Sequence, residues 1–220
     1  MSLELSGTTG VKGVAGSVAA PSIVGDDTNT GISFPAADTI KFSTGGVERM
    51  AITNSGVSGI AAGITMAQQW RVTTDFTVGT GDGDYSVTSN WESADTFGYG
   101  TMGSNLTESS GIFTFPSTGI YRIFSTALYN NTSGDNYRTK LNIYVTTDNS
   151  NYEAASTTVA SANTPAEHFV SMNCEWFFDV TDTSTHKFKI VVRTFQDTVK
   201  FRGNSNIQET GFHVFRLGDT

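Results

Sequence analysis

The N-terminal end of the sequence has few aromatic residues. Only Phe34 and Phe42 of the 25 aromatic residues fall within positions 1–66, and the other 23 lie in residues 67–220. Aromatic side chains supply the largest pieces of apolar surface that a core can use. Their scarcity excludes an ordinary globular core from the first 66 residues, whereas the remainder of the chain is able to form one. We therefore expect a stem followed by a head.

The chain also has little cysteine and no cluster of positive charge. Its single cysteine, Cys174, excludes an internal disulfide and a multi-cysteine zinc site, and its strand-like surroundings favour a buried apolar role over that of a nucleophile. The net charge is −8 without any run of Lys or Arg, so we expect no nucleic-acid binding. No apolar run of about 18 residues predicts a membrane span, and no signal peptide is visible. We expect assembly in a cytoplasm without membrane insertion.

Features that indicate catalysis or a bound metal are sparse. The three histidines are scattered without a Cys or carboxylate at ligand spacing, and no β-helix repeat is present that would carry paired carboxylates. We predict that the protein is not an enzyme and has no cofactor. Asp82 and Asp84 lie in a Gly-rich turn of the kind that binds calcium, but hairpin loops favour the same residues. We interpret this turn as a loop, with calcium as the alternative.

The first 57 residues divide into an arm and a short β-rich segment. In residues 1–24, Gly recurs at every third position from Gly7 to Gly16, but four triplets are too few for a collagen-like helix, so we expect an extended arm. Residues 25–57 contain short alternating runs that bury two or three apolar residues on a face, too few to offset the entropy lost on ordering. Several chains together would bury these faces around a shared axis. Residues 58–68 read as a linker.

From residue 69 the hydrophobic pattern has a period of two, which is typical of β-strands. Strong helix patterns are absent, and turn residues separate the expected strands at regular intervals. This arrangement predicts an all-β sandwich or jelly roll. The expected strands are residues 70–78, 112–115, 120–128, 140–146, 157–160, 169–180, 187–195, 199–202 and 211–217.

Two of these strands are apolar on both faces. Residues 120–128 place Ile123 on one face and Phe124 on the other, and residues 211–217 do the same with Val214 and Phe215. In a sandwich, a strand normally turns one apolar face to the core and one polar face to water. Because large exposed apolar patches are rare on monomers, the second apolar face predicts a subunit interface.

The head resembles the C1q/TNF-like jelly-roll family. Gly111, Phe113, Pro116, Gly119 and Tyr121 match a run of that family at the same spacing, and residues 210–217 are similar to its closing strand. The resemblance implies a C1q/TNF-like jelly roll over residues 69–218 and a homotrimer. The residues expected to pack in its core or at the trimer axis are Phe113, Phe115, Pro116, Gly119, Tyr121, Phe124, Phe212 and Phe215.

The stem resembles the repeated shaft element of bacteriophage fibre proteins. The matching positions are Gly25, Asp26, Gly31, Ile32, Asp38, Ile40, Glu48, Arg49, Met50, Ile52 and Gly56. A shaft followed by a C1q-like head is an arrangement of phages, including those of cyanobacteria. The resemblance therefore implies a structural virion protein with a short trimeric shaft over residues 25–57.

Three functions follow from these features. The first is a trimeric tail fibre or spike whose head binds a glycan or protein of the host surface. The second is a capsid head fibre or decoration protein that holds other virion proteins through its N-terminal arm. The third, a secreted C1q-like binding module, is disfavoured by the shaft element. Tyr- and Asn-rich loops are the expected receptor contacts, with plain solvated turns as the alternative; their residues are Tyr129, Asn130, Asn131, Asn136, Tyr137, Asn149, Asn151 and Tyr152.

Overall fold

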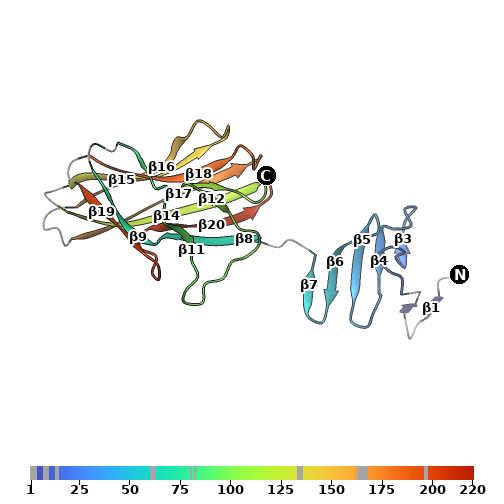
Figure 1. Cartoon of the computed structure of the whole chain (residues 1–220). Coiled ribbons are helices and arrows are strands. Elements are labelled where there is room, and N and C mark those ends of the chain that lie inside the picture. Colours follow the sequence, from blue (N-terminus) through green and yellow to red (C-terminus); the bar gives the residue numbers. More distant parts are fainter. Residues whose placement is uncertain are drawn as a thin grey trace. The chain divides into compact units, whose positions relative to one another are not determined.

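The computed structural model of the chain describes residues 4–6, 10–12, 15–59, 63–79, 81, 83–132, 136–162, 168–195 and 198–220. The named secondary-structure elements among these residues are all β-strands. None of the described residues belongs to a helix long and apolar enough to cross a bilayer. The chain divides into two compact units, Met1–Ala62 and Gly63–Thr220, which we call the stem and the head (Figure 1).

The stem contains a single layer of β-structure. Strands β1 (Glu4–Ser6) and β2 (Gly10–Lys12) pair with each other. Five short strands then form an antiparallel sheet in which each pairs with the next along the chain: β3 (Ile23–Val24), β4 (Gly31–Ser33), β5 (Ile40–Thr44), β6 (Val47–Thr53) and β7 (Gly56–Ser58). β3 lies inside the range expected to be an arm and extends the sheet instead.

The head is built from two sheets. The strands of the first are β8 (Met66–Val72), β9 (Thr74–Val78), β11 (Trp91–Ser93), β14 (Gly119–Asn131), β17 (Phe169–Val180), β19 (Val199–Asn204) and β20 (Gly211–Gly218). The strands of the second are β10 (Tyr85–Ser86), β12 (Thr107–Ser109), β13 (Ile112–Thr114), β15 (Asn136–Thr146), β16 (Glu153–Ala162) and β18 (Lys187–Thr194).

The strand order of the head is that of a jelly roll. In one sheet β8, β20, β14 and β17 lie side by side; in the other, the order is β13, β18, β15 and β16. The first of these eight strands thus pairs with the last, and the second pairs with the seventh, which is the order of two nested Greek keys. The expected all-β, jelly-roll head is confirmed.

Aromatic rings fill the space between the two sheets. Phe113 on β13 is fully buried, and its ring lies 4.6–5.3 Å, between centroids, from those of Trp70, Trp91, Phe188 and Phe212. Several of these contacts are edge-to-face, the geometry that aromatic quadrupoles favour. The residues that gather at Phe113 come from both sheets, so this cluster ties the sandwich together.

Two glycines of the run 111–121 occupy positions that a side chain cannot. Gly111 has a φ of +77°, and a Cβ there would lie 2.1 Å from the carbonyl oxygen of Val87. Gly119 has a φ of +143°, and its Cβ would meet Arg216 and Gly218 at 2.5 Å. The backbone path therefore requires glycine at both positions: Gly111 in the turn between β12 and β13, and Gly119 where the chain enters β14.

The structure corrects two strand boundaries. Residues 70–78 were expected to form one strand, but the chain changes neighbours at Thr73, so that β8 pairs with β20 and β9 pairs with β19. The amide of Thr73 donates to the carbonyl of Asn90 at that point instead of continuing either ladder. β8 also starts at Met66, inside the range expected to be a linker.

We expect the substitution Phe113→Ala to destabilise the head by about 3–5 kcal/mol, because it leaves a cavity among four rings. Urea unfolding followed by tryptophan fluorescence measures the loss. Phe97→Ala is the matched control, since the Phe97 side chain is 87% exposed. Equal midpoints for the two variants would contradict the central place of Phe113 in the core.

Candidate functional site

One face of the stem sheet carries two rows of apolar side chains. The register places Ile23, Ile32, Phe42 and Met50 opposite one another in four successive strands, and Ile40, Ile52 and Val57 in a second row. Residues directly opposite each other share a face, as do residues two apart on one strand. These seven residues therefore share one side of the sheet, which we call the apolar stem face.

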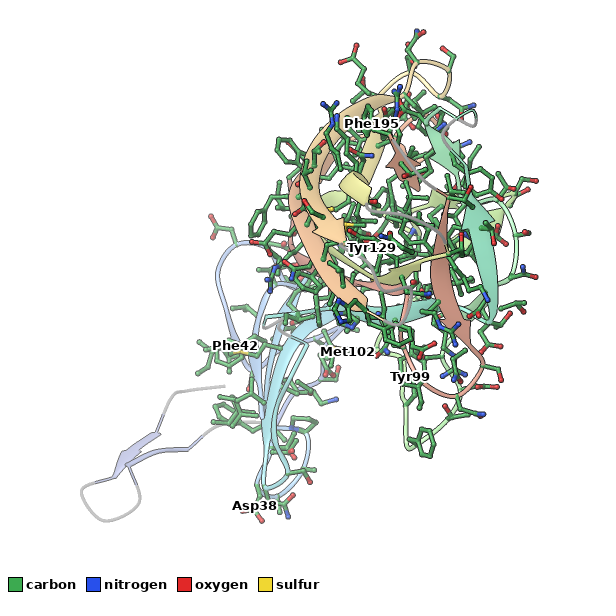
Figure 2. The ribbon with its side chains drawn as sticks, turned by 90° about the vertical axis from the view of Figure 1, so that its left-hand side faces the viewer. Asp38, Phe42, Tyr99, Met102, Tyr129 and Phe195 are labelled. Atoms are coloured by element: carbon green, nitrogen blue, oxygen red, sulfur yellow. The ribbon has the colours of Figure 1, made fainter. Side chains whose placement is uncertain are left out.

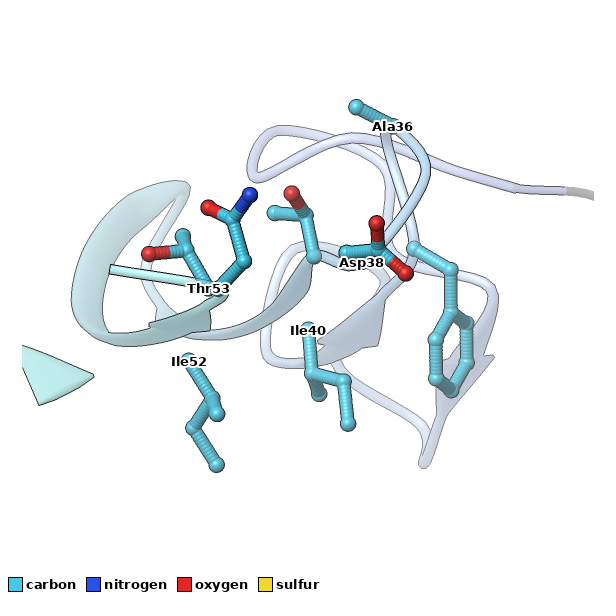
Figure 3. A pocket seen from close by; sticks show the side chains of 8 residues that line it. Ala36, Asp38, Ile40, Ile52 and Thr53 are labelled. Atoms are coloured by element: carbon cyan, nitrogen blue, oxygen red, sulfur yellow. The ribbon is translucent and has the colours of Figure 1, made fainter. Parts of the chain in front are cut away.

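No described part of the stem covers this face. Ile23 is 55% exposed and Val57 is 61% exposed, and the remaining members are half-buried or exposed. Figure 3 shows Ile40 and Ile52 pointing to the same side, where they line a shallow groove at one end of the face. The only fully buried stem residues in the described segments are the small Ser33, Ser43 and Ala51.

A second apolar face covers the outside of the first head sheet. In β14, the side chains of Tyr121, Ile123, Ser125, Ala127 and Tyr129 are fully buried in the core, and the residues between them point outward. The outward positions, together with their partners on β17 and β20, carry Ile120, Phe124, Leu128, Phe177 and Phe215. We call these five residues the apolar head face. The expectation that β14 is apolar on both sides is confirmed.

One ion pair and one imidazole lie among the residues of the apolar head face. Arg122 donates to Glu175 at 2.6 Å, and the imidazole of His213 stacks on Phe124 with centroids 5.8 Å apart. Burial lowers the pKa of His213, and the neighbouring positive charge of Arg122 lowers it further. Both effects disfavour a protonated imidazole, so His213 is neutral at pH 7 and compatible with a covered surface.

The residues expected to pack divide between the core and this outer face. Phe113, Phe115, Tyr121 and Phe212 lie in the core between the sheets. Phe124 and Phe215 point outward and are half-buried. Pro116 is exposed at the turn between β13 and β14, and Gly119 is buried beside Arg216. Of the aromatic residues in this set, only the outward pair is available for a subunit interface, because Phe113, Phe115, Tyr121 and Phe212 are already enclosed.

The expectation that Tyr129, Asn130 and Asn131 form an exposed loop is wrong. β14 continues through Asn131, and the side chains of Tyr129 and Asn131 are buried. Figure 2 shows Tyr129 inside the head. The Asn131 amide donates to the carbonyl of Ala162 at 2.6 Å, which ties β14 to the other sheet. Asn130 is half-buried and donates to the Asn131 carbonyl.

The other expected receptor contacts have different surroundings. In the turn between β15 and β16, the carboxylate of Asp148 accepts from the amides of Ser150 and Asn151 and from the Asn151 side chain, which lowers the pKa of Asp148. Asn151 thus holds the turn together, whereas Asn149 is exposed. Tyr152 is half-buried, with Lys189 over its ring. The side chains of Asn136 and Tyr137 lie outside the described residues.

In the turn considered for calcium, one of the two carboxylates, Asp84, is already engaged by other side chains. Asp84 accepts a hydrogen bond from the Tyr144 hydroxyl at 2.8 Å and lies 3.3 Å from Nη1 of Arg193. Asp82 lies outside the described residues. Within the described part of the chain, no group of three His, Cys, Asp or Glu side chains is arranged to hold a metal. The interpretation of this turn as a loop, with calcium as the alternative, stays a prediction.

Buried polar side chains in the head have structural roles. The thiol of Cys174 is buried, and burial raises its pKa to about 12, so it is not a thiolate nucleophile at neutral pH. The guanidinium of Arg71 is 2% exposed and pairs with Glu92 at 2.6 Å and Asp95 at 2.7 Å. These bonds fasten β8 to β11 and to the loop that follows it. No pattern in the sequence predicted that Arg71 would be buried and paired with two carboxylates.

A cluster of cations lies on the outer side of the second head sheet. Lys140 and Arg193 are directly opposite on β15 and β18, and Lys189 and Lys187 continue along the same side of β18. Arg138 joins them beside Phe195, with its guanidinium carbon 3.7 Å from the ring centroid. We call these five residues the basic face. It was not expected, because the strands that form it are far apart in the sequence.

No protein-family model and no curated protein matches the sequence. Several solved structures are similar. Murine APRIL at pH 5.0 is 14% identical over 69% of this chain and 99% of its own, with a TM-score of 0.47. Eiger TNF from S. frugiperda is 14% identical over 72% of this chain and 95% of its own, also with a TM-score of 0.47. The PRD1 vertex protein P5 is 13% identical over 71% and 100%, with a TM-score of 0.44.

The lowered pKa of His213 predicts a pH dependence of stability. The unfolded chain binds a proton at this imidazole near pH 6.5, and the folded chain binds it only at lower pH. Stability is therefore fully present above pH 6.5 and is lost as the pH falls below that value. We expect the His213→Gln variant to lose less stability than the wild type between pH 7.5 and pH 5.5.

Urea midpoints at both pH values measure the difference in stability. His168→Gln, at an exposed position, should behave as the wild type; if His213→Gln does so as well, the assignment fails.

Proposed function

We propose that the chain is a trimeric fibre or spike protein of a bacteriophage virion, in which the stem forms a short shaft and the head contacts the host surface. The observation that carries this proposal is the apolar stem face. A single sheet with one apolar side needs a second layer to be stable in water. No described residue of the stem provides that layer, whereas two further copies of the same stem would provide it around a shared axis.

The apolar head face supports the same assembly. Its central aromatic residue, Phe124, lies beside the neutral His213, and Phe177 is 55% exposed. Association through this face would cover Phe124, Phe177 and Phe215 together, and closed symmetric association is the usual way in which soluble chains cover such patches. The resemblance of residues 25–57 to a phage shaft element supports a place in the virion.

Mass measurement in solution tests this assembly. Static light scattering of the full chain after size exclusion should give three times the 23.5 kDa of one chain. In purified particles of the phage that encodes it, quantitative mass spectrometry should count tens of copies or fewer, as a tail fibre requires. A solitary folded chain at micromolar concentration would exclude the trimer, and hundreds of copies per particle would place the protein on the capsid instead.

The substitution Ile52→Asp tests the apolar stem face. A carboxylate at this position would be buried without a partner in the trimer, which costs several kcal/mol per chain. We expect the variant to dissociate at concentrations at which the wild type is trimeric, as measured by sedimentation velocity. Ser58→Asp is the matched control, because Ser58 is exposed and its register with Ala51 places it on the opposite side of the sheet. Trimers of unchanged stability with Ile52→Asp would remove this face from the interface.

A further inference from the structure

We propose that the basic face of the head binds an anionic polysaccharide, through carboxylate, sulfate or phosphate groups along the polymer. This inference rests on the proposed function and names the chemistry of the host-surface ligand. It also places the ligand on the sheet opposite to the apolar head face. The residues that carry it are Arg138 and Lys140 on β15 and Lys187, Lys189 and Arg193 on β18.

The concentration of positive charge on this face is unusual for this chain. The basic face holds five of the 13 Lys and Arg residues, although the net charge of the protein is −8. The two strands contain no acidic residue. Lys140 and Arg193 are direct cross-strand partners, an arrangement of like charges that destabilises a sheet. A sheet carries such a repulsive pair at a cost, which an anionic ligand would offset.

The three lysines of the basic face have no ion-pair partner in the described part of the chain. No described carboxylate lies within 4.0 Å of the ammonium groups of Lys140, Lys187 or Lys189, whereas Arg193 pairs with Asp84. Lys189 instead lies over the rings of Tyr144 and Tyr152, at 5.7 Å and 4.7 Å from their centroids. Among the described residues, these ammonium groups are therefore held in place without an ion pair.

Aromatic rings hold the cations in place at the other end of the face. The ring of Phe195 is approached by Arg138 at 3.7 Å, Arg193 at 4.5 Å and Lys140 at 5.4 Å. Cation–π contacts of this kind attract a cation to the ring without cancelling its charge. The positions along β18 from Lys187 to Arg193 span about 20 Å at the rise of a β-strand, so a polymer would meet several cations at once.

The proposed trimer leaves the basic face open. The two sheets of a sandwich turn their outer sides in opposite directions, and the apolar head face lies on the sheet formed by β8, β20, β14 and β17. Association through that sheet keeps the β13–β18–β15–β16 sheet accessible. Three copies of the basic face per trimer would then engage one long polymer, so weak individual contacts combine into firm binding.

Among polyanions, a polysaccharide fits this face better than a nucleic acid. Single-stranded nucleic acids are held by aromatic rings on which the bases stack. Here the rings of Tyr144, Tyr152 and Phe195 are occupied by cations of the face itself. The remaining outward positions on the flanking strands include the hydroxyl side chains of Thr107 and Thr114, which suit sugar hydroxyls.

Binding of the full chain to polygalacturonate, with its fully methyl-esterified form as the uncharged control, tests the proposal. We expect the wild type to bind the charged polymer alone and to weaken as the salt concentration rises to about 0.15 M, where exposed charges are screened beyond about 8 Å. The combined variant Lys140→Gln, Lys187→Gln, Lys189→Gln should bind about tenfold more weakly, since each exposed contact contributes modestly.

The combination Lys41→Gln, Lys200→Gln, Arg202→Gln is the matched control. It removes the same amount of positive charge elsewhere and should bind as the wild type. Thermal melting verifies that all three proteins are folded.

The outcomes separate this proposal from the proposed function. Equal binding by the two combined variants, binding of the esterified polymer, or no binding at low salt would overturn the polysaccharide site even if the protein is trimeric. Tighter binding of single-stranded DNA of equal charge to the same face would replace the polysaccharide by a nucleic acid. Light scattering on the same samples reports the oligomeric state. A monomer that binds polygalacturonate through the basic face would therefore retain the site and exclude the trimeric fibre.

Discussion

The number of apolar sheet faces in this chain exceeds the number of layers available to cover them. In the head, two sheets cover each other, and their inner sides meet in the ring cluster around Phe113. The outer side of the first sheet and one side of the stem sheet carry further apolar rows that no described element of the same unit covers. Because burial of apolar surface is the main favourable term in folding, each uncovered row favours association. The proposed trimer would cover both rows by association of identical chains.

The two outer sides of the head differ in chemistry, and this difference favours different partners for the two sides. On the first sheet, the one described cation–carboxylate pair among the central strands, Arg122 with Glu175, is internally neutral. The outer side of the second sheet keeps lysines without a described carboxylate partner. A neutral apolar surface suits a second copy of the same chain, whereas an excess of one charge suits a partner of opposite charge.

Features that depend on a single strand could be read from the sequence. The two-sided apolar character of residues 120–128 follows from a period of two, and the glycines at 111 and 119 stand where the backbone excludes a side chain. Features that depend on pairing between distant strands could not. Arg138 and Arg193 are 55 residues apart in the sequence, so their meeting at Phe195 requires the register of β15 with β18.

The sequence did not predict the end of β14 for a related reason. Asn130 and Asn131 have the composition of a turn, and the bond from Asn131 to Ala162 keeps them in the strand.

The basic face illustrates where local preference and global structure disagree. Sequences that specify one fold tend to satisfy every local rule, and departures from those rules concentrate at functional sites. Lys140 opposite Arg193 breaks the rule against like charges on facing strands, and the structure lessens the repulsion only in part, through Asp84 on Arg193 and the ring of Phe195. Tyr144 donates to the same Asp84, and burial together with that carboxylate raises the pKa of Tyr144 to about 12, so the hydroxyl keeps its proton and adds no negative charge of its own. Among the described residues, the face therefore keeps an excess of positive charge at neutral pH, and this excess is the basis of the proposed anionic ligand.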